Sequence, residues 1–123
     1  MWGVHIGVNR GNMTRVFRVA DITSNCSTRE RGRLVYPALA QFLRSGSTVG
    51  DEMVISFEGV DLVTPSFLDE TILQLVRAEP KGQVTLRAIR DFPIRSLERL
   101  LRATGSKVEV HRKSEGVYTV AAA

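Results

Sequence analysis

Residues 53–75 change their hydrophobic pattern from that of a strand to that of a helix across one short polar break. Met53–Phe57 is a mostly apolar run of the length of a buried strand. The following apolar residues recur three and four positions apart, at Phe67, Leu68, Ile72, Leu75 and Val76. Between the two patterns lies Thr64-Pro65-Ser66, and its proline lacks a backbone N–H and fixes φ. The pattern therefore predicts a sharp elbow between a strand and a helix within residues 53–79.

The segments before this stretch predict two strands and a helix. In residues 1–22, two strand-like runs are separated by the turn formers Asn9–Asn12, which indicates an antiparallel pair of edge strands. Residues 27–44 carry apolar side chains at helical spacing, and Ser27 followed by Glu30 matches a capping box at the helix start. Pro37 lies inside this helix and predicts a kink or a restart.

The segments after it continue the alternation. Residues 83–89 predict a strand, 93–103 a helix that ends at Gly105, and 107–110 with 117–120 a closing strand pair within residues 83–120. This order predicts an α/β fold, with a mixed sheet of four or more strands and about three helices packed on it. The strands at 53–57 and 83–89 are expected to be parallel neighbours, because one helix joins them.

Size and composition indicate one soluble domain. The chain has 123 residues, of which 43% are hydrophobic and 24% charged, which is ordinary globular usage. No apolar run is long enough to cross a bilayer, and the N-terminus lacks the pattern of a secretory signal. Cys26 is the single cysteine, which excludes an internal disulfide and fits a reducing compartment. We expect one domain over residues 1–123, located in the cytoplasm.

The net charge of +4 conceals an acidic middle between two basic flanks. Residues 10–35 carry +4 and residues 85–113 carry +5, whereas residues 51–80 hold seven acids against Arg77 and carry −6. Such alternation can steer a partner of matching polarity or promote self-association. The alternative is ordinary solvated surface charge.

The elbow is the first candidate site. Either Thr64 caps the helix with Pro65 in its first turn, or Ser66 is the cap with Asp69 supporting it. Both arrangements place hydroxyls where a strand ends and a helix begins, which is the usual binding edge of an open α/β sheet. Phe67 is then either a core residue or an exposed anchor for a partner. The alternative interpretation of Ser66 is a helix cap without a signalling role.

Residues 55–70, with Thr28-Arg29 upstream and Leu101–Gly105 and Val108 downstream, resemble the STAS-like domain family of unknown function. This bacterial family is distantly similar to anti-sigma-factor antagonists, in which an Asp-Ser-Ser-Gly elbow carries a phosphorylated serine. On that pattern Thr64 takes the Asp position, Pro65 the phosphoserine position and Ser66 the second serine. The resemblance covers roughly residues 29–110 and supports partner binding more than phosphorylation.

The resemblance implies a non-catalytic regulatory module that docks a protein partner through residues 64–70. The partner it suggests is an anti-sigma protein or a histidine-kinase-like ATPase. The residues expected to bind that partner, with the hydroxyls as possible phosphorylation sites, are Thr64, Ser66, Phe67, Asp69 and Glu70.

The hypothesis that the protein is an enzyme finds little support in the sequence. His5 and His111 lie near opposite ends and no cluster has metal-ligand spacing, so neither a metal site nor a cofactor is expected. Phosphate-binding and nucleophile-elbow motifs are absent. Arg29 and Arg31 lie close to Cys26 and could lower its pKa, but a structural thiol is the simpler interpretation. Asp69 and Glu70 are adjacent, so we expect them to diverge as exposed residues of a first helical turn.

Two further partners are compatible with the sequence. Arg95, Arg99 and Arg102 recur on one face of the last helix with Arg90 just before it, so they could contact the phosphates of a nucleic acid. The alternative function is thus a small basic nucleic-acid-associated protein. A homodimer formed through the N-terminal edge strands is a third possibility.

Overall fold

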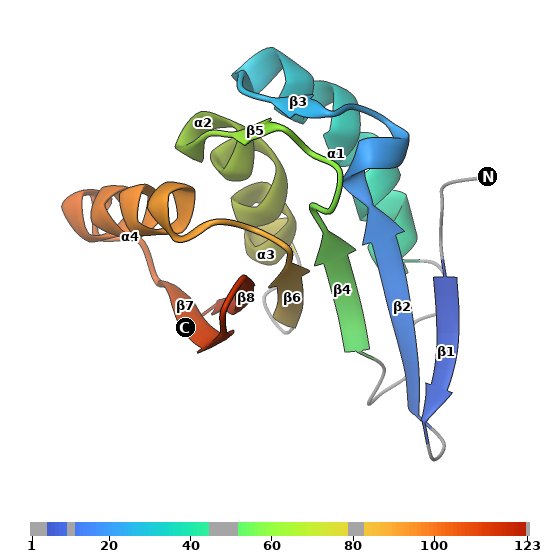
Figure 1. Cartoon of the computed structure of the whole chain (residues 1–123). Helices are drawn as coiled ribbons and strands as arrows, with labels where there is room; N and C mark the ends of the chain where they lie inside the picture. Colours follow the sequence, from blue (N-terminus) through green and yellow to red (C-terminus); the bar gives the residue numbers. More distant parts are fainter. Residues whose placement is uncertain (1–4, 10–11, 45–51, 79–82, 123) are drawn as a thin grey trace.

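In the computed structural model (Figure 1), which describes residues 5–9, 12–44, 52–78 and 83–122, the chain folds into a mixed α/β structure. One sheet has six strands in the order β1-β2-β4-β6-β8-β7, and a second sheet pairs β3 with β5. The strands are β1 (His5–Asn9), β2 (Asn12–Arg18), β3 (Asn25–Cys26), β4 (Glu52–Ser56), β5 (Leu62–Val63), β6 (Gln83–Arg87), β7 (Val108–Ser114) and β8 (Val117–Ala122). The predicted fold class is confirmed.

The pairing of the strands agrees with most of the predictions. β4 and β6 are parallel neighbours, and β1–β2 and β7–β8 are antiparallel pairs. One prediction is wrong, because only β1 of the N-terminal pair lies at an edge. β2 continues into the sheet by pairing in parallel with β4, with Val16 opposite Val54. Phe17 on β2 is fully buried, which explains why this strand belongs to the interior of the sheet.

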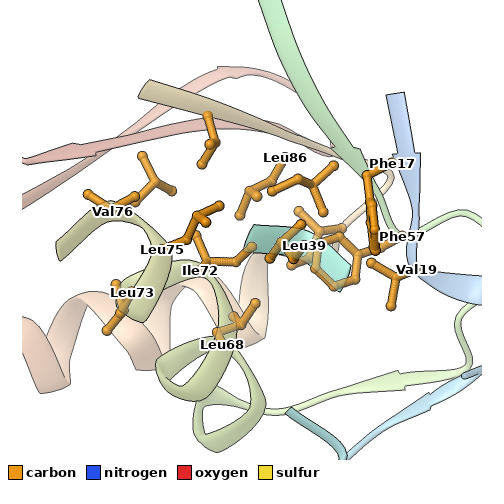
Figure 2. Packing of buried hydrophobic residues seen from close by; sticks show 14 of the residues in the cluster. Phe17, Val19, Leu39, Phe57, Leu68, Ile72, Leu73, Leu75, Val76 and Leu86 are labelled. Carbon is orange, nitrogen blue, oxygen red and sulfur yellow. The ribbon is translucent and has the colours of Figure 1, made fainter. Parts of the chain in front are cut away.

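The helices gather on one face of the large sheet, and the core lies between the two layers (Figures 1 and 2). They are α1 (Arg29–Arg44), α2 (Pro65–Leu68), the π-helical turn η2 (Asp69–Leu73), α3 (Gln74–Ala78) and α4 (Asp91–Thr104), preceded by the short 3₁₀ turn η1 (Val19–Asp21). Strand side chains that point toward the helices, such as Phe17, Ile55 and Leu86, join one hydrophobic cluster. Val16 and Val54 point to the other face and lie outside that cluster.

The capping of α1 differs from the sequence prediction. The cap is Thr28 rather than Ser27, because the Thr28 hydroxyl accepts a hydrogen bond from the backbone N–H of Arg31 at 3.1 Å. Ser27 lies one residue too early for this geometry, since a capping side chain bonds the second or third helical N–H. Of the kink or restart predicted at Pro37, the restart does not occur, because α1 continues through this residue.

The helix after the elbow contains a π-helical turn that the sequence did not indicate. α2, η2 and α3 follow one another directly, with η2 in the middle. The Thr71 hydroxyl donates to the carbonyl oxygen of Phe67 at 2.8 Å inside this region. At the other end of the fold, α4 ends at Gly105 with φ of 65°, which confirms the predicted left-handed cap.

Parts of the predicted elements lie outside the described residues. The parts concerned are residues 1–4 of the N-terminal strand pair, the middle of its turn at 10–11, and residue 79 of the predicted central helix. In the part of the chain that is described, no helix is long and apolar enough to cross a membrane.

Candidate docking site

The elbow is held by the small β3–β5 sheet. Asn25–Cys26 pairs in parallel with Leu62–Val63, and the backbone N–H of Thr64 donates to the Cys26 carbonyl at 3.0 Å. The Asp61 N–H donates to the carbonyl of Ser24 at 2.8 Å. Residues 24–26 therefore fix the chain that leads into the helix, although the sequence showed this segment only as a polar loop.

Thr64 is the cap of the elbow helix. Its hydroxyl accepts from the backbone N–H of Phe67 at 3.3 Å and donates to the Cys26 carbonyl at 3.4 Å, while Pro65 occupies the first helical position. Of the two arrangements that the sequence allowed, the structure has the first. The Thr64 hydroxyl is thus committed to the fold. Ser66 is only partly buried, and its hydroxyl bonds to no described residue.

Phe67 lies inside the core. Its side chain is 1% exposed, and its ring meets that of Phe57 edge-on at a centroid distance of 6.5 Å. Of the two roles left open for Phe67, the structure supports that of a core residue. The elbow reaches the surface beside it, through Ser66 and the acidic residues that follow.

Asp69 and Glu70 converge on one arginine instead of diverging as exposed acids. Nη1 of Arg29 lies 2.8 Å from Oδ2 of Asp69 and 3.2 Å from Oε1 of Glu70. Arg77 approaches Asp69 at 3.4 Å, and Arg33 approaches Glu70 at 3.7 Å. The hydrogen bonds that Arg29 donates to Asp69 and then to Glu70 raise the pKa of Arg29 above its ordinary value. The expectation of divergence is wrong because α1 from the basic flank packs directly against this turn.

Gly32 makes that packing possible. A Cβ at this position would lie 2.7 Å from Cβ of Glu70 and 3.2 Å from the carbonyl oxygen of Phe67. Both atoms belong to or adjoin the backbone of the elbow helix, so they cannot move aside cheaply. The acidic middle of the sequence is therefore partly neutralised within the fold by the N-terminal basic flank.

Cys26 is a structural thiol. Its side chain is fully buried, and desolvation raises its pKa to about 12 although Arg31 acts in the opposite direction. Arg31 does lower this pKa, as the sequence suggested, but burial outweighs the effect of its guanidinium charge and the net shift is upward.

Beside the elbow, a pocket of about 320 Å³ opens at the carboxyl ends of β4 and β6. Its apolar lining includes Phe57, Val60, Leu62, Val63, Ile89 and Phe92. Asp61 and Arg90 add one charge of each sign. Leu62 is 52% exposed and Phe92 is 73% exposed, so large apolar side chains border the opening.

The backbone beside the pocket is strained at one position. Ala88 lines the pocket with φ of 59°, a left-handed conformation that residues with a Cβ rarely adopt. Strain of this kind is concentrated at functional sites in proteins. Sequence reasoning identified neither this residue nor Phe92. Phe92 could have been found, because it stands off the apolar face formed by Ile94, Leu97 and Leu101.

Only three of the four arginines predicted to contact a nucleic acid lie on a shared surface. Arg95, Arg99 and Arg102 line a shared groove together with Glu98, whereas Arg90 lines the apolar pocket. Arg95 also lies 3.7 Å from the carboxylate of Asp91. Elsewhere among the described residues, His111 lies 3.4 Å from Glu109, and no cluster of histidine, cysteine and carboxylate side chains could hold a metal ion.

The central part of the chain matches a known protein family. Residues 35–91 match the family described as a STAS-like domain of unknown function. The resemblance inferred from the sequence is thereby confirmed. The STAS-like match begins within α1, contains the whole elbow and most of the pocket lining, and ends one residue before Phe92. No curated protein and no solved structure gives a significant match to the chain.

Proposed function

We propose that this STAS-like protein is a non-catalytic, cytoplasmic regulatory module that binds a protein partner. The docking surface would comprise the pocket together with residues 61–66 of the elbow. The family match supports a regulatory role in general terms. The observation that carries the proposal is the apolar pocket at the carboxyl ends of β4 and β6, bordered by exposed Leu62 and Phe92.

Position and exposure both favour binding at this surface. Open α/β sheets bind ligands outside the carboxyl ends of their strands, where the pocket lies. Large exposed apolar side chains that surround a concave surface are typical of protein-interaction sites, because an apolar anchor from the partner removes them from water. Ser66 follows this lining by three residues, and its partly buried hydroxyl, unlike that of Thr64, bonds to no described residue.

The resemblance suggests the class of partner. An anti-sigma protein or a histidine-kinase-like ATPase is the partner we propose, and Ser66 would lie at the border of that contact. Thr64 is less suited to modification, because its hydroxyl already caps the helix. Phosphorylation at the family position is disfavoured by Pro65.

Two exposed leucines provide a matched test. Leu62 borders the pocket and is 52% exposed, while Leu34 on α1 is 59% exposed and does not line it. The tagged protein is crosslinked in its host, the captured partner is purified, and its affinity is measured by calorimetry. We expect Leu62→Asp to weaken binding at least tenfold, about 1.4 kcal/mol, and Leu34→Asp to leave it unchanged. Equal affinities for the two variants would reject the pocket as the docking surface.

Ser66 is tested in the same assay. We expect Ser66→Asp to weaken binding of the purified partner, because a negative charge would enter the border of the contact. We expect Ser66→Ala to leave the affinity unchanged. An unchanged affinity for Ser66→Asp would restrict the docking surface to the pocket.

A further inference from the structure

We propose that α4 recognises an acidic segment of the partner, which inserts an apolar side chain into the pocket and places its carboxylates along the arginine groove. This inference rests on the proposed function and adds the chemistry of the bound segment. It combines two features that neighbour each other along α4, namely exposed Phe92 at the pocket and the stripe formed by Arg95, Arg99 and Arg102.

These four residues form one continuous stripe on the helix. At 100° per residue, Phe92, Arg95, Arg99 and Arg102 fall within an arc of about 80°. All four are exposed. The opposite side of α4 is buried through Pro93, Ile94, Leu97 and Leu101. The stripe thus faces solvent along its length, beginning at the apolar pocket.

The arginines of this stripe are available to a partner. Arg99 contacts only the hydroxyl of Ser96, at 3.5 Å, and neither Arg99 nor Arg102 forms an ion pair with a described residue. Among the described residues, Arg95 has one ionic partner, Asp91 at 3.7 Å, which Arg112 also approaches at 3.7 Å. Carboxylates from another chain would therefore meet guanidinium groups that the fold does not use.

Charge and shape favour an acidic peptide over a nucleic acid. Glu98 lies in the groove among the arginines and Asp61 lines the pocket, so a uniform polyanion would meet repulsion at both places. A peptide can place its carboxylates beside the arginines and an apolar side chain in the pocket. Phe92 and Arg102 are ten residues apart, about 15 Å along the helix. About five residues of an extended segment, or ten of a helical one, span that length.

A random peptide library displayed on phage tests the chemistry without a known partner. The wild-type protein is compared with Arg99→Glu/Arg102→Glu and with a control, Arg44→Glu/Lys113→Glu, which makes the same change in net charge at two exposed positions outside the groove. We expect the wild type and the control to select peptides with an apolar residue followed or preceded by Asp and Glu. We expect the groove variant to lose this preference for acids.

The selected peptides are then synthesised and titrated by fluorescence anisotropy. Binding should fall at least tenfold with Arg99→Glu/Arg102→Glu, and also when the apolar residue of the peptide becomes alanine. Urea unfolding of the groove variant should match that of the control, since the substituted side chains are exposed. Selection of neutral or basic peptides, or unchanged affinity for the groove variant, would overturn the proposal.

Two further comparisons separate this inference from the proposed function. If Leu62→Asp releases the peptides while the groove variant still binds them, the pocket remains the docking surface and the recognition of an acidic segment is rejected. If Leu62→Asp also leaves the peptides bound, the proposed docking surface itself fails. A short DNA duplex is titrated in parallel, and tighter binding of that duplex through Arg99 and Arg102 would assign the groove to nucleic acid instead.

Discussion

The elbow and the α4 stripe both carry a phenylalanine and several charged residues, yet their surroundings are opposite. At the elbow, Phe67 is 1% exposed, and Asp69 and Glu70 are bound by arginines of the same chain. On α4, Phe92 is 73% exposed, and Arg99 and Arg102 have no ionic partner among the described residues. Concentrated charge in a sequence therefore does not identify a binding surface, because the fold can neutralise that charge with its own residues.

The largest expected effect separates the two phenylalanines. Phe67→Ala should lower the free energy of unfolding by about 3–5 kcal/mol, because it empties a filled core position. Phe92→Ala should change it by less than about 0.5 kcal/mol, because its ring contributes little to the core. Urea denaturation of both variants measures the contrast. Similar losses for both would show that Phe92 is a structural residue and would remove it from the docking surface.

The next largest effect concerns the close packing of α1 against the elbow helix. Gly32→Ala should destabilise the protein by about 1–3 kcal/mol, because its Cβ would collide with Glu70 and the backbone of Phe67. Helix propensity alone predicts the opposite sign, a gain of about 1 kcal/mol. Thermal or urea unfolding decides between them.

Gly105→Ala is the matched control for Gly32→Ala. It introduces a Cβ that meets no atom within 4 Å, so only the left-handed backbone at φ 65° opposes it. Its expected cost is about 1 kcal/mol. A stabilising Gly32→Ala would contradict the close packing between α1 and the elbow helix.

We expect the stability of the protein to depend on pH through Cys26, which belongs to the small β3–β5 sheet of the elbow. The folded thiol has its pKa raised to about 12 from 9.0, so between these values the unfolded chain loses its proton more readily than the folded one. Stability from this group is full below pH 9 and is lost as the pH rises toward 12. Alkaline urea titrations of the wild type and Cys26→Ala should therefore diverge in this window. Parallel curves, or rapid alkylation of Cys26 in the folded protein at neutral pH, would contradict its burial.

The smallest expected effect concerns the ion pairs of the elbow. Asp69→Asn and Glu70→Gln should each lower stability slightly at low salt, because each removes a charge that Arg29 binds. The loss should fade at about 1 M salt, where the screening length is about 3 Å. Ser66→Ala is the control, since its hydroxyl bonds to no described residue. A loss that persists at high salt would mean that hydrogen-bond geometry, more than charge, holds α1 to the elbow.

Local pattern predicted the elements of the fold better than the contacts between them. Periodicity gave the order of strands and helices, and it placed β4 beside β6 because one helix joins them. Proline and glycine chemistry predicted Pro65 at a helix start and Gly105 at a helix end. These features depend on neighbours in sequence, which is why they could be read without the structure.

Other features of the candidate site depend on residues far apart in the chain. The β3–β5 sheet joins residues 25–26 to 62–63, and each strand is too short to show a hydrophobic period. The arrangement of Arg29 with Asp69 spans forty positions. The pocket lies between the connections that follow β4 and β6, and no local pattern indicates that Leu62 and Phe92 share it.

Local sequence pattern predicted a mixed α/β fold, a proline-stiffened elbow, and an arginine face on α4. Which of these features remain accessible to a partner depends on tertiary packing. It buried Phe67, capped the helix with Thr64 and bound the acids to Arg29, and it left Phe92, Arg99 and Arg102 facing solvent. Periodicity assigns a side chain to a face of its own element, whereas exposure and ionic partners depend on which other elements pack against that face.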